Sequence, residues 1–149
     1  MWIFKRNNRT ELMKYLDSFK KTKRKLMQID IFDENENILL QIFKGSDVYL
    51  WEKEFKRAVL DKEINESFIF LIQFNEVKEN NLLNLCRFKE SDWSSRFYKK
   101  KLYGQKFYFH ILPFDDSKII EVKIRDILRT VYNLQKEDKL KFTLSGPKN

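Results

Sequence analysis

The chain carries few of the side chains that perform nucleophilic or metal-dependent chemistry. It has one cysteine, Cys86, and one histidine, His110. A structural zinc site needs four Cys or His ligands, so these two residues cannot form one. A histidine-activated thiolate would need the two side by side, but each falls in a strand-like segment where it is most simply a core or half-buried residue. We therefore expect a non-catalytic protein without a cofactor.

Phosphate chemistry by a glycine-rich loop is also excluded. The chain has three glycines, and neither G-x-G-x-x-G nor G-x-x-x-x-G-K-[ST] occurs in it. Without such a loop, no run of backbone N–H groups is available to hold the phosphates of a nucleotide. A P-loop hydrolase is therefore ruled out.

One group of carboxylates has the composition of a metal-dependent nuclease. Asp115 and Asp116 precede Glu121 and Lys123, and such enzymes bind Mg²⁺ through acidic residues while a lysine orients the attacking water. Only four residues separate Asp116 from Glu121, which makes it difficult for these carboxylates to converge on a metal. The simpler interpretation is a turn that leads into the solvent face of a strand. The nuclease remains a second alternative.

The net positive charge is concentrated in two short segments. Residues 1–25 carry nine Lys and Arg against two acidic residues, and residues 96–106 carry five against none. Because the whole chain has a net charge of +8, the remaining residues carry a net charge of −4. Charge that served only solubility would not need to be clustered. The clusters therefore indicate contacts with an acidic partner.

The second basic segment alternates with aromatic rings. The rings are Trp93, Phe97, Tyr98 and Tyr103. Cations that contact phosphates and rings on which bases stack are the components of a single-strand binder. On a strand that begins at Lys106, Tyr108 and His110 share one face, and they form a stacking platform if nothing covers that face. If the face is covered, the rings belong to the core and the lysines are ordinary solvated charges.

The first basic segment ends an amphipathic helix that we expect to run from an N-cap at Thr10 to about Arg24, with Leu12, Leu16 and Phe19 on one face. Cations favour the last turn of a helix, so the helix dipole accounts for part of the charge. Five cations in residues 20–25 exceed what capping requires. Docking on an anionic membrane is disfavoured because the apolar face is needed to cover the sheet.

The composition and these segments predict a small binding module that engages an acidic macromolecule. A protein partner is slightly favoured, as for an immunity or accessory protein, and single-stranded nucleic acid is the alternative. The candidate binding residues are Lys20, Lys21, Arg24, Lys25, Arg96, Lys99, Lys100, Lys101, Tyr103, Lys106, Tyr108 and His110.

The apolar periodicity predicts the remaining elements. The Lys118 to Ile124 stretch fits both a strand and a helix, and its adjacent isoleucines favour a strand. The expected strands are Met27 to Ile31 and Ile38 to Ile42 around a turn at Asp33 to Asn37, then Phe68 to Phe74, Leu82 to Phe88, Lys106 to Leu112, Lys118 to Ile124 and Leu140 to Leu144. The other expected helices start at Ser46 or Asp47 and end near Lys62, start at Ser91 or Asp92 and end before Gly104, and run from Arg125 to Gln135.

This order predicts an α+β fold with a mainly antiparallel sheet and about four helices, in the order α-β-β three times and then α-β. The length of 149 residues fits a single domain over 1–149, with a short flexible tail at 145–149. The longest apolar run has five residues and no leader pattern is present, so we expect a cytoplasmic location. The Lys-rich and Asn-rich composition is typical of a bacterial protein.

Overall fold

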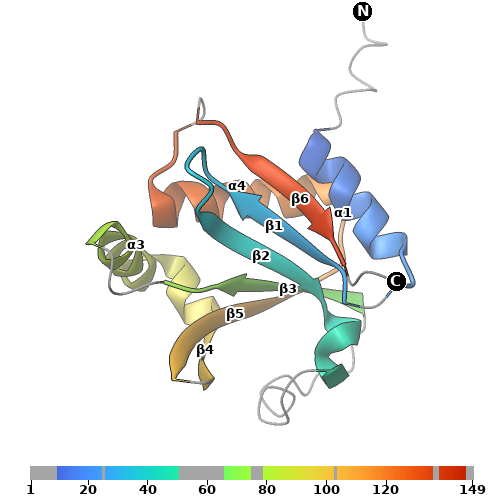
Figure 1. The fold of residues 1–149 in the computed structure, drawn as a ribbon, viewed down its shortest axis with the longest axis horizontal. Coiled ribbons are helices and arrows are strands. Elements are labelled where there is room, and N and C mark those ends of the chain that lie inside the picture. The colour runs from blue at the N-terminus through green and yellow to red at the C-terminus, as the bar shows by residue number, and fades with distance from the viewer. Residues whose placement is uncertain are drawn as a thin grey trace, which may run out of the picture.

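A computed structural model of the chain describes residues 10–24, 26–50, 66–74, 79–102, 104–135 and 138–146. The fold is α+β, with a six-stranded antiparallel sheet in the order β4-β5-β3-β2-β1-β6 (Figure 1). The strands are β1 (Gln28–Phe32), β2 (Ile38–Lys44), β3 (Ser67–Ile72), β4 (Tyr98–Leu102), β5 (Gln105–Pro113) and β6 (Lys141–Ser145). The helices are α1 (Glu11–Lys21), α3 (Glu79–Glu90) and α4 (Ser117–Tyr132), with 3-10 helices η2 (Gly45–Leu50) and η4 (Asp92–Arg96).

The main core lies between one face of the sheet and the helices. Helix α4 passes behind β1 and β2 in Figure 1, and its buried stripe, which includes Ile120 and Ile124, joins the core cluster of Leu16 and Phe19 from α1. Alternate residues of the central strands complete this cluster, as the two-residue period of a strand requires. None of the helices in the described residues combines the length and apolar character that a membrane span needs.

Several elements confirm the predictions from sequence. Thr10 caps α1, since its hydroxyl accepts a hydrogen bond of 3.1 Å from the N–H of Met13. Strands β1 and β2 form the expected hairpin, and in its turn the Oδ1 atom of Asp33 accepts from the N–H groups of Asn35 and Asn37, each at 2.9 Å. Strand β3 lies in the middle of the sheet, and β5 and β6 form where strands were expected.

The strand predicted at Leu82 to Phe88 is wrong, because this segment lies within helix α3. Residues 79–90 contain no β-branched side chain and several good helix formers, so local propensity favours a helix. Leu85 and Phe88, three residues apart, are buried, whereas Leu82 and Cys86 are exposed. Burial on one face only is typical of a helix that packs on one side of a sheet.

The strand predicted at Lys118 to Ile124 is also wrong, since α4 is continuous over its sixteen residues. Asp116 is its N-cap and accepts a hydrogen bond of 2.8 Å from the N–H of Lys118. The preference of β-branched residues for strands is a fraction of a kcal/mol per residue. The free energy gained by burying the isoleucines of α4 against the sheet is larger.

A third correction concerns the second basic segment. The helix expected from Ser91 to Gly104 is replaced by the short η4 and then by strand β4. Gly104 does not end a helix; its φ of +78° places it in the tight turn between β4 and β5. Lys99, Lys100 and Lys101 therefore lie on an edge strand instead of a helix end, and Lys106 lies on the neighbouring strand β5.

The described residues thus contain three α-helices, and the predicted α-β-β repeat does not match the observed order. The helix expected from Ser46 or Asp47 starts as the 3-10 helix η2, and its continuation from 51 to 62 lies outside the described residues. Asp47 is buried and accepts a hydrogen bond from the N–H of Leu26 at 3.2 Å. Ser145, the first residue of the expected tail, pairs with Gln28 in the sheet, and residues 147–149 lie outside the described residues.

Candidate binding surface

The second basic segment lies at one edge of the sheet. Within the described residues, β4 has a strand neighbour on one side only, which is β5. Lys99 is opposite Tyr108 and Lys101 is opposite Lys106 in this ladder. Because side chains alternate along a strand, Lys99, Lys101 and Lys106 point to the same face. We call these three residues the basic hairpin.

The basic hairpin contains a pair of like charges. Lys101 and Lys106 are directly opposite each other across the two strands. Like charges in such cross-strand positions destabilise a sheet by roughly 0.2–1 kcal/mol. A sequence that needed only a stable hairpin would place an acidic or neutral residue at one of the two positions. The pair therefore concentrates positive charge near the tip of the hairpin.

The aromatic rings of this segment are mostly buried. Trp93 and Phe97 belong to the core, and Tyr108 is 6% exposed, with its ring 4.9 Å from that of Phe88. Tyr108 is therefore on the covered face, and the stacking platform that an uncovered face would have provided is not formed. Tyr98 is 50% exposed, and its ring stacks on Phe109 on the opposite face.

His110 links the start of β4 to the core beside the basic hairpin. Its Nδ1 lies 3.0 Å from the carbonyl oxygen of Arg96, and because a carbonyl only accepts, Nδ1 carries the proton. The rings of Phe97 and Trp93 lie 5.3 and 6.0 Å from the imidazole. Burial lowers the pKa of His110 and outweighs the hydrogen bond to Arg96, and the charges of Arg96 and Lys123 lower it further.

The lowered pKa of His110 predicts a loss of stability in mild acid. The unfolded chain takes up a proton near the ordinary histidine pKa of 6.5, whereas the folded chain takes it up only at lower pH, so the free energy of unfolding falls as the pH drops below about 6.5. Urea unfolding at several pH values should show a smaller fall for His110→Gln. His110 is the only histidine of the chain, so an equal fall in both proteins would contradict this account.

Arg96 is held at the base of the hairpin by an aromatic contact. Its guanidinium lies 5.0 Å from the centre of the Trp93 ring, a cation–π geometry. The Nε1–H of Trp93 donates a hydrogen bond of 2.9 Å to Asp126 on α4, which fixes the ring. Arg96 is exposed above it and adds a fourth cation near the basic hairpin.

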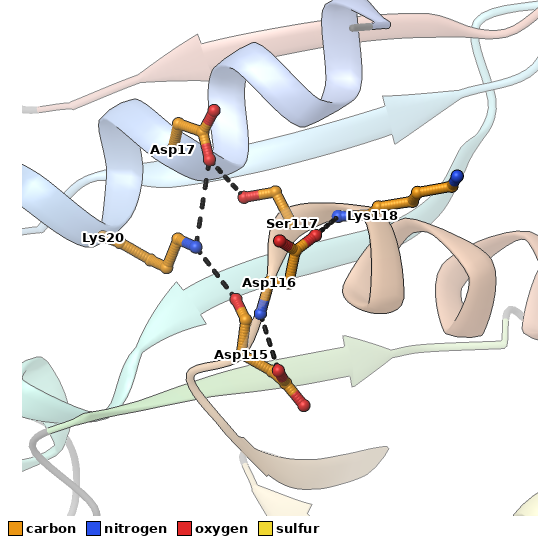
Figure 2. A network of polar contacts seen from close by, with 6 residues as sticks. All are labelled: Asp17, Lys20, Asp115, Asp116, Ser117 and Lys118. Atoms are coloured by element: carbon orange, nitrogen blue, oxygen red, sulfur yellow. Dashed lines mark hydrogen bonds and ion pairs between the residues drawn. The ribbon is translucent and has the colours of Figure 1, made fainter. Parts of the chain in front are cut away.

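The first basic segment has a different role. Figure 2 shows Lys20 between α1 and the start of α4, where its Nζ donates a hydrogen bond of 2.9 Å to the carbonyl oxygen of Asp115 and lies 3.8 Å from Asp17. Ser117 donates to Asp17 at 2.5 Å in the same network. Lys20 therefore joins the two helices.

The other described candidates of the first segment are at the surface. Lys21 and Arg24 are exposed at and beyond the end of α1. Two of the predicted residues, Lys25 and Tyr103, lie outside the described residues. Lys100 points to the same face as Tyr98, away from the basic hairpin.

The two basic segments lie toward opposite ends of β5. Lys20 contacts Asp115, two residues beyond the end of this strand, whereas Lys106 is near its start. The eight steps from Gln105 to Pro113 span about 27 Å at 3.4 Å per residue. This length exceeds twice the Debye length, which is about 8 Å at physiological ionic strength. Lys20 and Lys106 therefore lie on separate parts of the surface, whereas Arg96, whose carbonyl oxygen contacts His110, is nearer to the Asp115 end of β5.

The carboxylates of the nuclease hypothesis lie in the junction between α1 and α4. Glu121 is buried on α4, not on a strand, and its carboxylate accepts hydrogen bonds from the hydroxyl of Thr10 and, at 3.0 Å, from the Nε–H of Arg125. Asp116 caps α4. In the part of the chain that the structure describes, no three His, Cys, Asp or Glu side chains are grouped closely enough to hold a metal ion.

A cleft of about 700 Å³ opens at the end of the sheet near the tip of the β4–β5 hairpin, and the sequence did not predict it. It lies between the β1–β2 turn, the end of β3, helix α3 and the end of α4. Asn81, Asn84 and Arg87 of α3 line it, and their spacing of three places them on one face of a helix. That spacing would have identified them if residues 82–88 had been interpreted as a helix.

The chain was compared with protein-family models, with curated proteins and with solved structures, and none of them matches it.

Proposed function

We propose that this protein is a non-catalytic binding module that engages an acidic protein through the basic hairpin. The observation that carries the proposal is that Lys99, Lys101 and Lys106 share one face at the sheet edge, with two of them directly opposed. An acidic partner would contact several of these cations at once. Such charges mainly raise the association rate and select the partner, as an immunity or accessory protein requires.

The aromatic side chains favour a protein partner over single-stranded nucleic acid. Binding of unpaired bases relies on exposed rings, because stacking supplies much of the affinity. Trp93, Phe97 and Tyr108 are buried, and of the described rings in this segment only Tyr98 is largely exposed. The described part of this basic surface, with one largely exposed ring, is better suited to carboxylates than to bases.

The position of Lys99 and Lys101 on an edge strand agrees with this assignment. An exposed strand edge pairs readily with other chains, and lysines discourage such pairing. The same lysines repel a second copy of this chain but attract an acidic segment. The charge of the basic hairpin therefore selects among partners that approach the edge.

The experiment compares two labelled probes of similar charge, a decaglutamate peptide and a decamer of oligo(dT), by fluorescence anisotropy. We expect Lys99→Ala, Lys101→Ala and Lys106→Ala together to weaken peptide binding by roughly tenfold to a hundredfold, at about 0.5–1 kcal/mol for each exposed charge. The matched control replaces Lys14, Lys21 and Lys23, exposed lysines on and just after α1, by alanine. It makes the same change in net charge and should weaken binding less than about threefold.

Two outcomes would contradict the proposal. Equal losses in the two triple variants would mean that the peptide responds to net charge alone. Tighter binding of oligo(dT), lost in the hairpin variant with a steep dependence on salt, would instead support the nucleic-acid alternative.

A further inference from the structure

The cleft beside helix α3 is lined by side chains that match the groups of a peptide. Asn81, Asn84, Gln73 and Asn35 all contribute to its lining. Each amide carries both a donor and an acceptor, as a peptide unit does. The volume of about 700 Å³ lies within the usual range of ligand sites, roughly 300–1,000 Å³.

Arg87 gives the cleft a cationic group. It is half-buried on α3, and its Nη1 donates a hydrogen bond of 2.9 Å to Oδ1 of Asn84. A guanidinium has five N–H donors, and this bond uses one of them. Among the described residues no carboxylate forms an ion pair with Arg87. Its planar fork is the geometry that binds a carboxylate with two parallel hydrogen bonds.

The other polar groups of the cleft are engaged within the fold. Asp33 is the acidic residue of the lining, and both of its oxygens accept hydrogen bonds within the β1–β2 turn, from Asn35 and Asn37. The hydroxyl of Tyr132 donates to the carbonyl oxygen of Leu39. Burial raises the pKa of Tyr132, so its hydroxyl stays uncharged. Arg87 is therefore the cation of the lining.

The cleft and the basic hairpin are adjacent. Gln73, which lines the cleft, donates a hydrogen bond of 2.5 Å from its Nε2 to the Oε1 of Gln105. Gln105 is the first residue of β5 and directly precedes Lys106, whose side chain points to the other face of the sheet. An extended segment that contacts the lysines at the hairpin tip therefore reaches the cleft within a few residues.

We infer that the cleft receives an acidic residue of the partner segment. Arg87 binds the carboxylate of this residue, and the surrounding side-chain amides bind the peptide groups of the segment. This inference rests on the proposed function, because it assigns the same acidic partner a second point of contact. The basic hairpin then attracts the segment, and the cleft selects the position of one carboxylate along it.

The test uses a tetraglutamate peptide with blocked ends, followed by NMR of ¹⁵N-labelled protein. We expect the side-chain NH₂ signals of Asn81 and Asn84 to shift during the titration. Arg87→Gln should weaken binding about tenfold, as expected for loss of a charge-assisted hydrogen bond. Lys89→Gln is the matched control, since Lys89 is an exposed cation on the same helix outside the cleft, and it should change the affinity less than about twofold.

Arg87→Lys keeps the charge but not the planar fork, so it should restore only part of the affinity. The titration of the unsubstituted protein does not depend on how well the variants fold. Unchanged Asn81 and Asn84 signals, while the backbone signal of Lys106 shifts, would overturn the inference and leave the proposed function standing. Equal affinities of Arg87→Gln and Lys89→Gln would also overturn it. Loss of binding in Arg87→Gln but not in the triple hairpin variant would support the cleft and contradict the proposed function.

Discussion

Replacement of Phe88 by alanine is expected to lower the free energy of unfolding by about 3–5 kcal/mol. Phe88 is 1% exposed. Its ring lies 4.9 Å from Tyr108, 5.3 Å from Phe97 and 5.7 Å from Phe74. The change removes the ring from a cluster with three aromatic neighbours and leaves a cavity that the surrounding strands cannot fill by small shifts.

This loss should extend to both parts of the proposed binding surface. Phe88 follows Arg87 on α3, and two of the rings it contacts come from β5 and from the residue that precedes β4. Urea unfolding monitored by tryptophan fluorescence measures the change. Leu82→Ala on the same helix is the control, because Leu82 is 44% exposed and its replacement should cost less than about 1 kcal/mol. Similar losses in the two variants would show that α3 does not pack through Phe88.

Elements whose apolar spacing fits one period were predictable from the sequence. Helix α1 buries Leu12, Leu16 and Phe19 at helical spacing, and it has a capping threonine. The β1–β2 hairpin alternates, and Asp33 opens a turn that its own carboxylate stabilises. In these segments local preference and burial favour the same structure.

The errors occurred where two periods fit the same residues. In α4 the sequence from Ile120 to Ile124 satisfies both alternation and helical spacing, and the choice depends on burial against the sheet, which is a non-local contact. In α3 the apolar residues at 82, 83 and 85 suggest a strand, yet Leu82 and Leu83 are exposed. Tertiary packing, which the local pattern does not contain, decided α4, whereas in α3 the local propensity of residues 79–90 already favours a helix.

The candidate surface was only partly predictable. The clustered charge indicated Arg96 to Lys106 without any knowledge of the fold. The face that each lysine occupies depends on the pairing of β4 with β5, which places Lys99 and Lys101 on one side and Lys100 on the other. Arg87 was missed because its neighbours Asn81 and Asn84 share a face with it only on a helix.

Replacement of Glu121 by alanine is expected to lower the free energy of unfolding by about 1.5–3 kcal/mol, the usual contribution of hydrogen bonds to a charged group. Glu121 is buried on α4, and its carboxylate accepts from the hydroxyl of Thr10 and from Arg125. The Thr10 oxygen also accepts from the N–H of Met13 and so caps α1. Loss of the carboxylate therefore disturbs the first turn of α1 as well as the contact between the helices.

A double-mutant cycle of Thr10→Ala and Glu121→Ala, followed by urea unfolding, tests this coupling. The combined loss should be smaller than the sum of the single losses by about 0.5–3 kcal/mol, because either change removes the same hydrogen bond. Thr10→Ser keeps the hydroxyl and should have nearly the same free energy of unfolding as the unchanged protein. Strictly additive losses in the cycle would contradict a hydrogen bond between Thr10 and Glu121.

A substitution of Glu121 also distinguishes the proposed binding module from the nuclease alternative. A catalytic Glu121 predicts that Glu121→Gln, which conserves volume, removes Mg²⁺-dependent or Mn²⁺-dependent cleavage of DNA and leaves stability nearly unchanged. If Glu121 instead stabilises the contact between α1 and α4, Glu121→Gln should lower the free energy of unfolding and leave any cleavage unchanged. The reason is that the amide cannot replace the carboxylate in the ion pair with Arg125. Because the carboxylate of Glu121 already binds side chains from α1 and α4, we expect the change to appear in unfolding and not in cleavage.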